Sequence, residues 1–302
     1  MRVRIWGARG SVPTPGAHKV YFGGNTSCVE IDGQTEDLLV CDAGTGLYYL
    51  GQDIMRRELS PKRIHILLSH LHWDHIQGLP FFAPAFSRDY QVIVYYPRYI
   101  FSSGADMLRL QQRYSGLDDA ELDKYSLDYR ELDDRAAVKI GGWCLRTVAL
   151  NHSVLDLGYR IEAEGKSVCY CTDAEPGGKL LLGSNIDIEA LRSGQISFDA
   201  GVLHESDREL LRFIYEADLC IQDAMFDREL FERRVGWGHS PYEFTMELAY
   251  IAKVKRLLMF HFDPANDDNM LRAVEAKARD LAGRYRESLQ IFNAREGWEL
   301  LV

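Results

Sequence analysis

One hexapeptide, His70-Leu71-His72-Trp73-Asp74-His75, gathers three imidazoles and a carboxylate within six residues. In an extended segment, residues two apart point the same way, so His70 and His72 can share one metal ion. The chain must then turn, and Asp74 and His75 face a different direction, in which a second metal ion can bind. Imidazoles with a few carboxylates suit zinc, and iron or manganese can use the same set. The hexapeptide therefore predicts a metal centre.

Three further candidate ligands follow apolar segments elsewhere in the chain: His152, Asp173 and His261. Sites in open α/β sheets form outside the carboxyl ends of strands, which is where each of these residues would stand. A single histidine in such a place is often a satisfied core residue. Asp74, with Gln77 three residues on, could likewise serve only as a helix N-cap. The shared placement of the three residues favours metal ligation over these alternatives.

Short apolar segments that end in polar residues recur along the chain and indicate buried strands. They cover residues 38–41, 64–68, 145–150, 167–171 and 256–260. Helices are clearest at Ser240-Pro241-Tyr242-Glu243, a capping box with proline at the first helical position, and at the apolar repeat of residues 270–281. Strands that alternate with helices through short connections predict the α/β class.

We expect one domain over residues 1–302, because the chain has no repeat, low-complexity stretch or Ser/Gly linker. Residues 99–136 are acidic and rich in Tyr and Leu, which predicts helices inserted between strands. Residues 175–210 contain several glycines and indicate a loop-rich insertion. Long insertions often form lids or dimer contacts, so a homodimer is one expectation. The other is a surface elaboration with no catalytic part.

The composition is that of a soluble globular protein, with 46% hydrophobic and 26% charged residues. The formal net charge of −10 argues against a dedicated binder of long nucleic acid, which usually carries a basic stripe. A small anionic substrate remains compatible, because bound divalent metals can invert the local field. Without a signal peptide or an apolar run of about 18 residues, we expect a cytoplasmic protein that does not span a membrane. The six cysteines lack Cys-x-x-Cys spacing, which predicts reduced core residues.

These motifs resemble the metallo-β-lactamase superfamily over essentially the whole chain. The matching elements are Asp42-Ala43-Gly44-Thr45-Gly46, the hexapeptide, His152, Asp173 and His261. The resemblance implies a four-layer αββα sandwich with a binuclear site along one edge of its two sheets. It assigns His70, His72 and His152 to the first metal, Asp74, His75 and His261 to the second, and Asp173 to a bridging position. It places Asp42 behind the ligands, where it would orient a ligand histidine.

The C-terminal part resembles the phosphodiesterase branch of that superfamily, which includes RNase Z and small cyclic-phosphate phosphodiesterases. The resemblance rests on Gly238-His239-Ser240 at the start of a helix, and it implies that His239 contacts the scissile phosphate while Asp223 supports it. A helix N-terminus also favours phosphate binding on physical grounds. We therefore expect His239, Ser240 and Asn25 to bind substrate. The alternative is that Ser240 merely caps the helix and His239 is a loop residue.

The reaction expected from this resemblance is hydrolysis of a small or cyclic phosphodiester, for example a nucleotide. Two divalent metal ions, Zn²⁺ or alternatively Mn²⁺ or Fe, would hold a bridging hydroxide that attacks phosphorus. Asp74 would orient the hydroxide or accept its proton. His239, held by Asp223, would help to protonate the leaving oxygen.

One departure from RNase Z of the bacterial type concerns the protruding arm that grips transfer RNA. Only twenty residues separate His152 from Asp173, and they predict a simple hairpin with its turn at Glu164-Gly165. The missing arm and the negative net charge favour a small substrate. Three alternatives stay open: an RNase Z-like nuclease, a hydrolase of carbon esters, thioesters or lactams on the same metals, and a non-enzymatic binding protein.

Overall fold

The computed structural model describes residues 1–33, 36–57, 61–99, 103–117, 127–178, 187–197, 203–285 and 289–302. Its strands form two mixed sheets of seven strands each. The first sheet contains, in spatial order, β14 (Glu299–Leu301), β1 (Arg2–Gly7), β2 (Cys28–Asp32), β3 (Asp37–Cys41), β4 (Arg63–Leu67), β5 (Gln91–Pro97) and β6 (Leu127–Leu132). The second contains β13 (Gln290–Asn293), β12 (Arg256–Phe260), β11 (Leu219–Asp223), β10 (Lys166–Cys171), β9 (Asp156–Ala163), β8 (Trp143–Leu150) and β7 (Ala137–Ile140).

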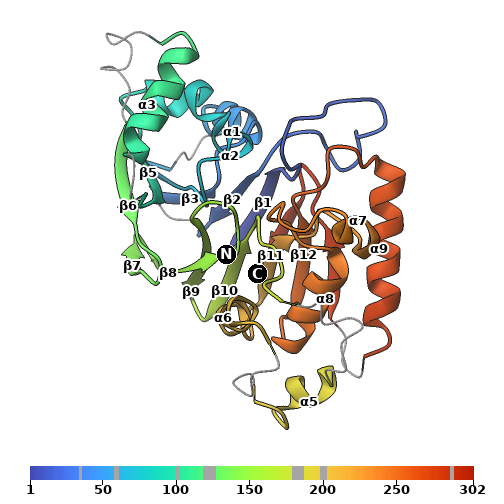
Figure 1. The fold of residues 1–302 in the computed structure, drawn as a ribbon. Helices are drawn as coiled ribbons and strands as arrows, with labels where there is room; N and C mark the ends of the chain where they lie inside the picture. Colours follow the sequence, from blue (N-terminus) through green and yellow to red (C-terminus); the bar gives the residue numbers. More distant parts are fainter. Residues whose placement is uncertain are drawn as a thin grey trace.

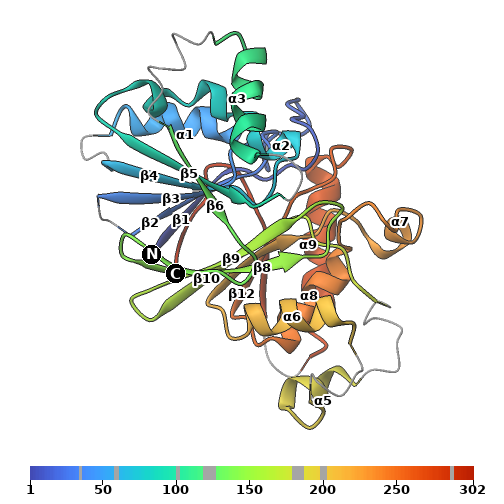
Figure 2. The same cartoon turned by 60° about the vertical axis from the view of Figure 1, so that its left-hand side comes forward.

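Helices cover the outer faces of the two sheets, which gives the molecule four layers (Figures 1 and 2). Beside the first sheet lie α1 (Gly46–Ile54), α2 (Trp73–Ile76), α3 (Gly104–Tyr114) and two 3₁₀ turns, η1 (Leu79–Phe81) and η2 (Ala83–Phe86). Beside the second lie α5 (Ile188–Ser193), α6 (Glu205–Ile214), α7 (Arg228–Glu232), α8 (Tyr242–Ile251) and α9 (Asp268–Ala282). The fold is therefore the four-layer αββα sandwich that the resemblance implied.

Two large hydrophobic clusters of the described residues hold these layers together, and side-chain alternation along the strands separates them. In β4, Ile64 and Ile66 point outward and pack with the apolar face of α1, where Leu47 and Leu50 are fully buried. Leu67 belongs instead to the larger core, which fills the space between the sheets and extends beneath the helices of the second sheet. The apolar segments of the sequence thus form strands that are buried on both faces, except in β8, from which Cys144 and Arg146 point to solvent.

The hairpin of β9 and β10 spans most of the distance between His152 and Asp173. The two strands pair antiparallel from Lys166 opposite Ala163. Glu164 and Gly165 form the turn with φ values of 52° and 72°, the left-handed pair that a two-residue hairpin loop requires. The simple hairpin predicted from the sequence is confirmed, and it carries no inserted arm.

The structure corrects two of the expected elements. Within residues 99–136, α3 is a helix as predicted, but residues 127–132 form the edge strand β6, which pairs in parallel with β5. The solvent-exposed edge carries polar residues, which hides the strand from a search for apolar segments. Helix α8 begins at Tyr242 with Pro241 as its N-cap, so Ser240 does not cap it. Of the loop-rich stretch 175–210, residues 179–186 and 198–202 lie outside the described residues, and α5 and the start of α6 occupy part of the rest.

All six cysteines are free thiols, and five of them are buried. Cys144 is exposed because it points to solvent from β8, so the prediction of core packing is wrong for this residue. In the described part of the chain, no helix combines the length and the apolar character needed to cross a membrane.

Candidate metal centre

The candidate ligands meet at one edge of the sandwich, where several parallel strands from both sheets end. His70 follows β4 of the first sheet, whereas Asp173 and His261 follow β10 and β12 of the second. Asp173 and His261 have φ values of 47° and 60°, and Asp42, directly after β3, has a φ of 61°. This left-handed backbone is uncommon for residues other than glycine, and it turns the side chains sharply away from the strand direction.

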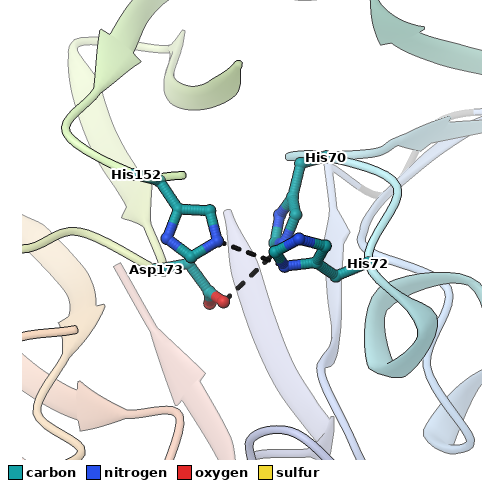
Figure 3. Close-up of side chains that lie close together, drawn as sticks. All are labelled: His70, His72, His152 and Asp173. Carbon is teal, nitrogen blue, oxygen red and sulfur yellow. Dashed lines mark hydrogen bonds and ion pairs between the residues drawn. The ribbon is translucent and has the colours of Figure 1, made fainter. Parts of the chain in front are cut away.

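The first cluster consists of His70, His72, His152 and Asp173, whose ligand atoms all lie within 4.8 Å of one another. Figure 3 shows the four side chains converging from opposite sides of the site. His152 Nε2 lies 3.2 Å from His72 Nδ1, and His70 Nε2 lies 3.7 Å from Asp173 Oδ2. His70 Nε2 is buried and has no hydrogen-bond partner among the described residues. Such an unsatisfied nitrogen, facing other donors, fits a metal ligand.

The second cluster combines Asp74, His75 and His261, and Asp173 reaches it with its other oxygen. His75 Nε2 lies 3.2 Å from both His261 Nε2 and Asp74 Oδ2. Asp173 Oδ1 lies 3.1 Å from His261 Nε2 and 3.4 Å from His75 Nε2. Ligands at ~2.1 Å from a tetrahedral zinc ion stand roughly 3.4 Å apart, so these spacings fit such an ion. Asp173 contacts both clusters, as a bridging ligand must.

The protonation preferences of these groups also suit cations. Burial lowers the pKa of His70 well below its ordinary value, and the His75 imidazole lowers it further. Burial alone would raise the pKa of Asp173, but His261 and His75 hold it well below its ordinary range. Burial opposes protonation of His75, yet Asp74, Asp173 and Asp42 raise its pKa well above the ordinary value. The carboxylates of this site are therefore stabilised by positive charge, which protons or divalent cations can provide.

Asp42 lies behind the second cluster and accepts four hydrogen bonds. Its donors are the His75 ring through Nδ1 at 2.7 Å, the Tyr170 hydroxyl at 2.6 Å, and the amide and hydroxyl of Ser69 at 2.7 and 2.9 Å. The bond from Nδ1 turns His75 Nε2 toward Asp74 and His261. Asp42 therefore fixes the orientation of the His75 ring through this hydrogen bond.

Two carboxylates near the candidate metal centre were not predicted from the sequence. Asp156, the first residue of β9, is fully buried with Oδ2 only 3.1 Å from His70 Nδ1, so it stands behind the first cluster as Asp42 stands behind the second. Its signal in the sequence was an isolated aspartate at the start of an apolar strand. Glu175 accepts hydrogen bonds from the amides of Gly236 and Gly238. No local sequence pattern predicts the hydrogen bonds of Glu175, because their donors lie about sixty residues away in the chain.

His239 and Asp223 form a pair beside the two clusters. The His239 ring donates from Nδ1 to Asp223 Oδ2 at 2.8 Å, and the other oxygen of Asp223 accepts from the Met225 amide at 2.9 Å. Burial opposes protonation of His239, but the charge and hydrogen bond of Asp223 prevail and raise its pKa to about 9. Asp173, Asp223, His239 and His261 could also be grouped as ligands, because their atoms lie within 4.8 Å. The bond between Nδ1 and Asp223 leaves His239 Nε2 as the nitrogen that can meet a substrate.

The remaining two candidates, Ser240 and Asn25, have their polar groups engaged within the protein. Ser240 is fully buried, and its hydroxyl donates to the carbonyl oxygen of Ala174 at 2.5 Å. This bond fixes the loop ahead of α8 and leaves no exposed surface for a ligand, so the expected substrate contact of Ser240 is not supported. Asn25 donates to Glu296 at 2.9 Å and accepts from the Thr45 hydroxyl at 3.1 Å, which ties it into the wall of a neighbouring cleft.

Residues 38–262 match the family model described as "Beta-lactamase superfamily domain". The chain therefore belongs to the β-lactamase superfamily. It is similar to Ribonuclease Z of Archaeoglobus fulgidus, with 28% identity over 65% of this chain and 69% of that protein. Among solved structures it resembles unliganded yeast PDE1, with a TM-score of 0.67, 14% identity and coverage of 100% of this chain and 99% of the other. Human tRNase Z, short form, gives a TM-score of 0.61 at 17% identity, covering 100% and 99%.

Proposed function

We propose that this protein is a binuclear metal-dependent hydrolase that cleaves phosphodiesters, with small or cyclic diesters such as nucleotides as its substrates. The observation that carries the proposal is the His239–Asp223 pair, held at 2.8 Å beside two clusters of imidazoles and carboxylates. The sequence relative named ribonuclease Z and the fold shared with yeast PDE1 support the same chemistry.

The two clusters fit two divalent cations, for which we propose zinc ahead of manganese or iron because imidazoles predominate. The ligands of the first would be His70, His72 and His152, those of the second Asp74, His75 and His261, and Asp173 would be shared. When bound, such ions supply positive charge that polarises a phosphoryl group and activates water.

The side chains around the clusters provide positioning and proton transfer. Asp42 orients the His75 imidazole through its hydrogen bond, and Asp156 Oδ2 lies 3.1 Å behind Nδ1 of His70. Asp223 accepts the hydrogen bond from Nδ1 and raises the pKa of His239 to about 9, so near neutral pH the ring is protonated on both nitrogens. We assign the Nε2 proton to protonation of the leaving oxygen. Asp74 Oδ2 accepts a hydrogen bond from the Ser11 amide at 2.7 Å, which fixes the carboxylate that would orient the attacking water.

The first experiment is hydrolysis of bis(p-nitrophenyl) phosphate by purified protein whose metal content is measured in the same sample. We expect turnover by the wild type and its near loss in Asp74→Ala. We expect His239→Ala to keep its metal while turnover falls roughly 10²–10⁴-fold, the usual contribution of a general acid. A metal-loaded wild type that leaves every phosphodiester intact contradicts the proposal and moves carbon esters and thioesters forward.

A ribonuclease Z-like activity is the second candidate, because the similar sequence from Archaeoglobus fulgidus bears that name. The plain β9–β10 hairpin and the net charge of −10 favour the small substrate over transfer RNA. A precursor transfer RNA with a 3′ extension, offered beside the small diester, separates the two candidates through their relative kcat/KM values.

A further inference from the structure

A cleft of about 630 Å³ lies beside α2, the helix that contains Asp74 and His75. One wall comes from α1, α2 and η1, and the other from the loop that follows β1, seen in blue near α2 in Figure 2. Its volume lies in the range of small-molecule sites, and none of the seven candidate ligands lines it. The roles proposed so far therefore leave the cleft without an occupant.

Four large rings line this cleft and remain accessible to solvent. Trp73 is 57% exposed, Phe81 54%, Tyr49 53% and Tyr48 44%. Exposed aromatic side chains that gather in one concave surface mark a ligand site more often than a chance feature of the surface. Rings of this kind bind planar groups by stacking on their faces.

Each wall of the cleft is connected to Asp74, one through the chain and the other through a hydrogen bond. Trp73 precedes it in the chain, and both belong to the first turn of α2. On the other side, Ser11 donates its amide to Asp74 Oδ2, and Pro13, two residues further on, lines the cleft. The cleft and the candidate metal centre thus share the segments on either side of Asp74.

The polar lining indicates what kind of planar group fits. Asn25 and Thr45 both line the cleft, but the Thr45 hydroxyl donates its hydrogen bond to Asn25 Oδ1 and not into the cleft. Gln77 also lines the cleft, and none of the side-chain hydrogen bonds found among the described residues involves its amide group. A primary amide offers both donors and an acceptor, the combination that reads the edge of a nucleobase. Stacking surfaces beside a free amide thus match a heteroaromatic base.

We infer that this cleft binds the nucleobase of a nucleotide substrate, which stacks on Trp73 and meets Gln77 at its edge. The inference rests on the proposed phosphodiesterase function and deepens it, because it assigns the substrate to the nucleotides. It separates the recognition of the base from the phosphate chemistry at the metal centre.

The test compares two phosphate monoesters that differ only in the base, adenosine 5′-monophosphate and ribose 5-phosphate. Calorimetry on the metal-loaded protein gives both dissociation constants. Stacking on an aromatic side chain predicts that the adenosine compound binds at least about tenfold more tightly in the wild type. In Trp73→Ala we expect the ratio to fall within about twofold of unity, and Trp73→Phe should restore most of it, because the ring is retained.

Tyr114→Ala is the matched control, since Tyr114 is an exposed aromatic residue of α3 outside the cleft. It should keep the wild-type ratio. A second variant, Gln77→Ala, should reduce the ratio while leaving the binding of ribose 5-phosphate unchanged. Equal binding of the two compounds by the wild type, or an undiminished ratio in Trp73→Ala, overturns the inference.

Turnover of methyl p-nitrophenyl phosphate, which has no base, separates this inference from the proposed function. If the wild type hydrolyses this diester but shows no preference for the adenosine compound, the cleft inference fails and the phosphodiesterase stands. If the preference exists and depends on Trp73 while no diester is hydrolysed, the cleft binds a base and the proposed reaction fails.

Discussion

At the scale of single residues, the candidate metal centre depends on positions where only one residue type fits, including a position where no side chain fits. Gly238 is the clearest case. Its amide donates to Glu175 at 2.7 Å, its carbonyl accepts from His152 Nδ1 at 3.0 Å, and its φ is +84°. A Cβ atom at this position would overlap the ring of His152. The glycine thus determines where a proposed ligand lies.

Gly238→Ala should displace His152 and weaken metal binding about 10–100-fold, the usual effect of disturbing the support of a ligand. Gly236→Ala is a close control, because its φ is +89° and nothing lies within 4 Å of the added Cβ. Both variants bear the same backbone cost, so competitive chelator titration isolates the effect on His152. Equal losses in the two variants would show that backbone strain alone is responsible.

Asp42→Asn should likewise lower metal affinity, by about 10–100-fold, because an amide cannot accept all four of the present hydrogen bonds. Asp218→Asn serves as the control. Asp218 is also a buried carboxylate that accepts bonds, here from Ser167 and Lys255, but it contacts none of the proposed ligands. Thermal unfolding should report a loss of stability in both variants, and metal titration a change only in Asp42→Asn.

At the scale of elements, strand β4 contains a buried histidine that is separate from the metal centre. Burial lowers the pKa of His65, and its contact with Asp37 at 3.1 Å only partly opposes this shift. The unfolded chain therefore takes up the proton at a higher pH than the folded chain does. It follows that stability falls as the pH drops below about 6.5, the ordinary histidine value.

We expect His65→Gln to reduce this acid-dependent loss, because glutamine cannot bind the proton. Urea unfolding at pH 7.5 and 5.5 measures the free energy of unfolding, and the difference between the two pH values should be smaller in the variant. His18→Gln provides the comparison, since His18 is exposed on the loop after β1. An unchanged difference in His65→Gln would contradict the assignment.

The elements also show what the sequence could reveal. The proposed ligands could be found because the hexapeptide and the three other residues each come just after an apolar segment, and strand ends of a parallel sheet meet at one edge. Strand β6 could not, since an edge strand needs apolar residues on only one face. Asp156 and Glu175 were missed because their partners, His70 and the amides of Gly236 and Gly238, come together only in the folded chain. Ser240 fits a capping box in the sequence, but its hydroxyl donates a hydrogen bond to the carbonyl oxygen of Ala174 instead.

At the scale of the whole molecule, the two clusters join the two halves of the sandwich. The hexapeptide follows β4 of the first sheet, whereas His152, Asp173 and His261 belong to the second. Bound cations would therefore link the sheets and stabilise the folded state through their affinity for it. When the free metal concentration is a thousand times the dissociation constant, one site adds about 4 kcal/mol to the free energy of unfolding.

Removal of metal by a chelator should accordingly lower the melting temperature and increase amide exchange at the edge where the clusters lie. Re-addition of zinc should restore both. In the double variant His72→Ala/His152→Ala, which removes two of the proposed ligands, the response to chelator should be clearly smaller. A melting temperature that does not depend on metal in the wild type would argue against cations between the sheets.

The left-handed backbone at Asp173 and His261 has a consequence for how this chain can evolve. Glycine or asparagine would adopt the same conformation with less strain, so the backbone at these two positions favours residues other than the present ones. Selection for function alone keeps the present side chains. A descendant that no longer needed the reaction would gain stability by losing them, and its first substitutions should appear at these two strand ends.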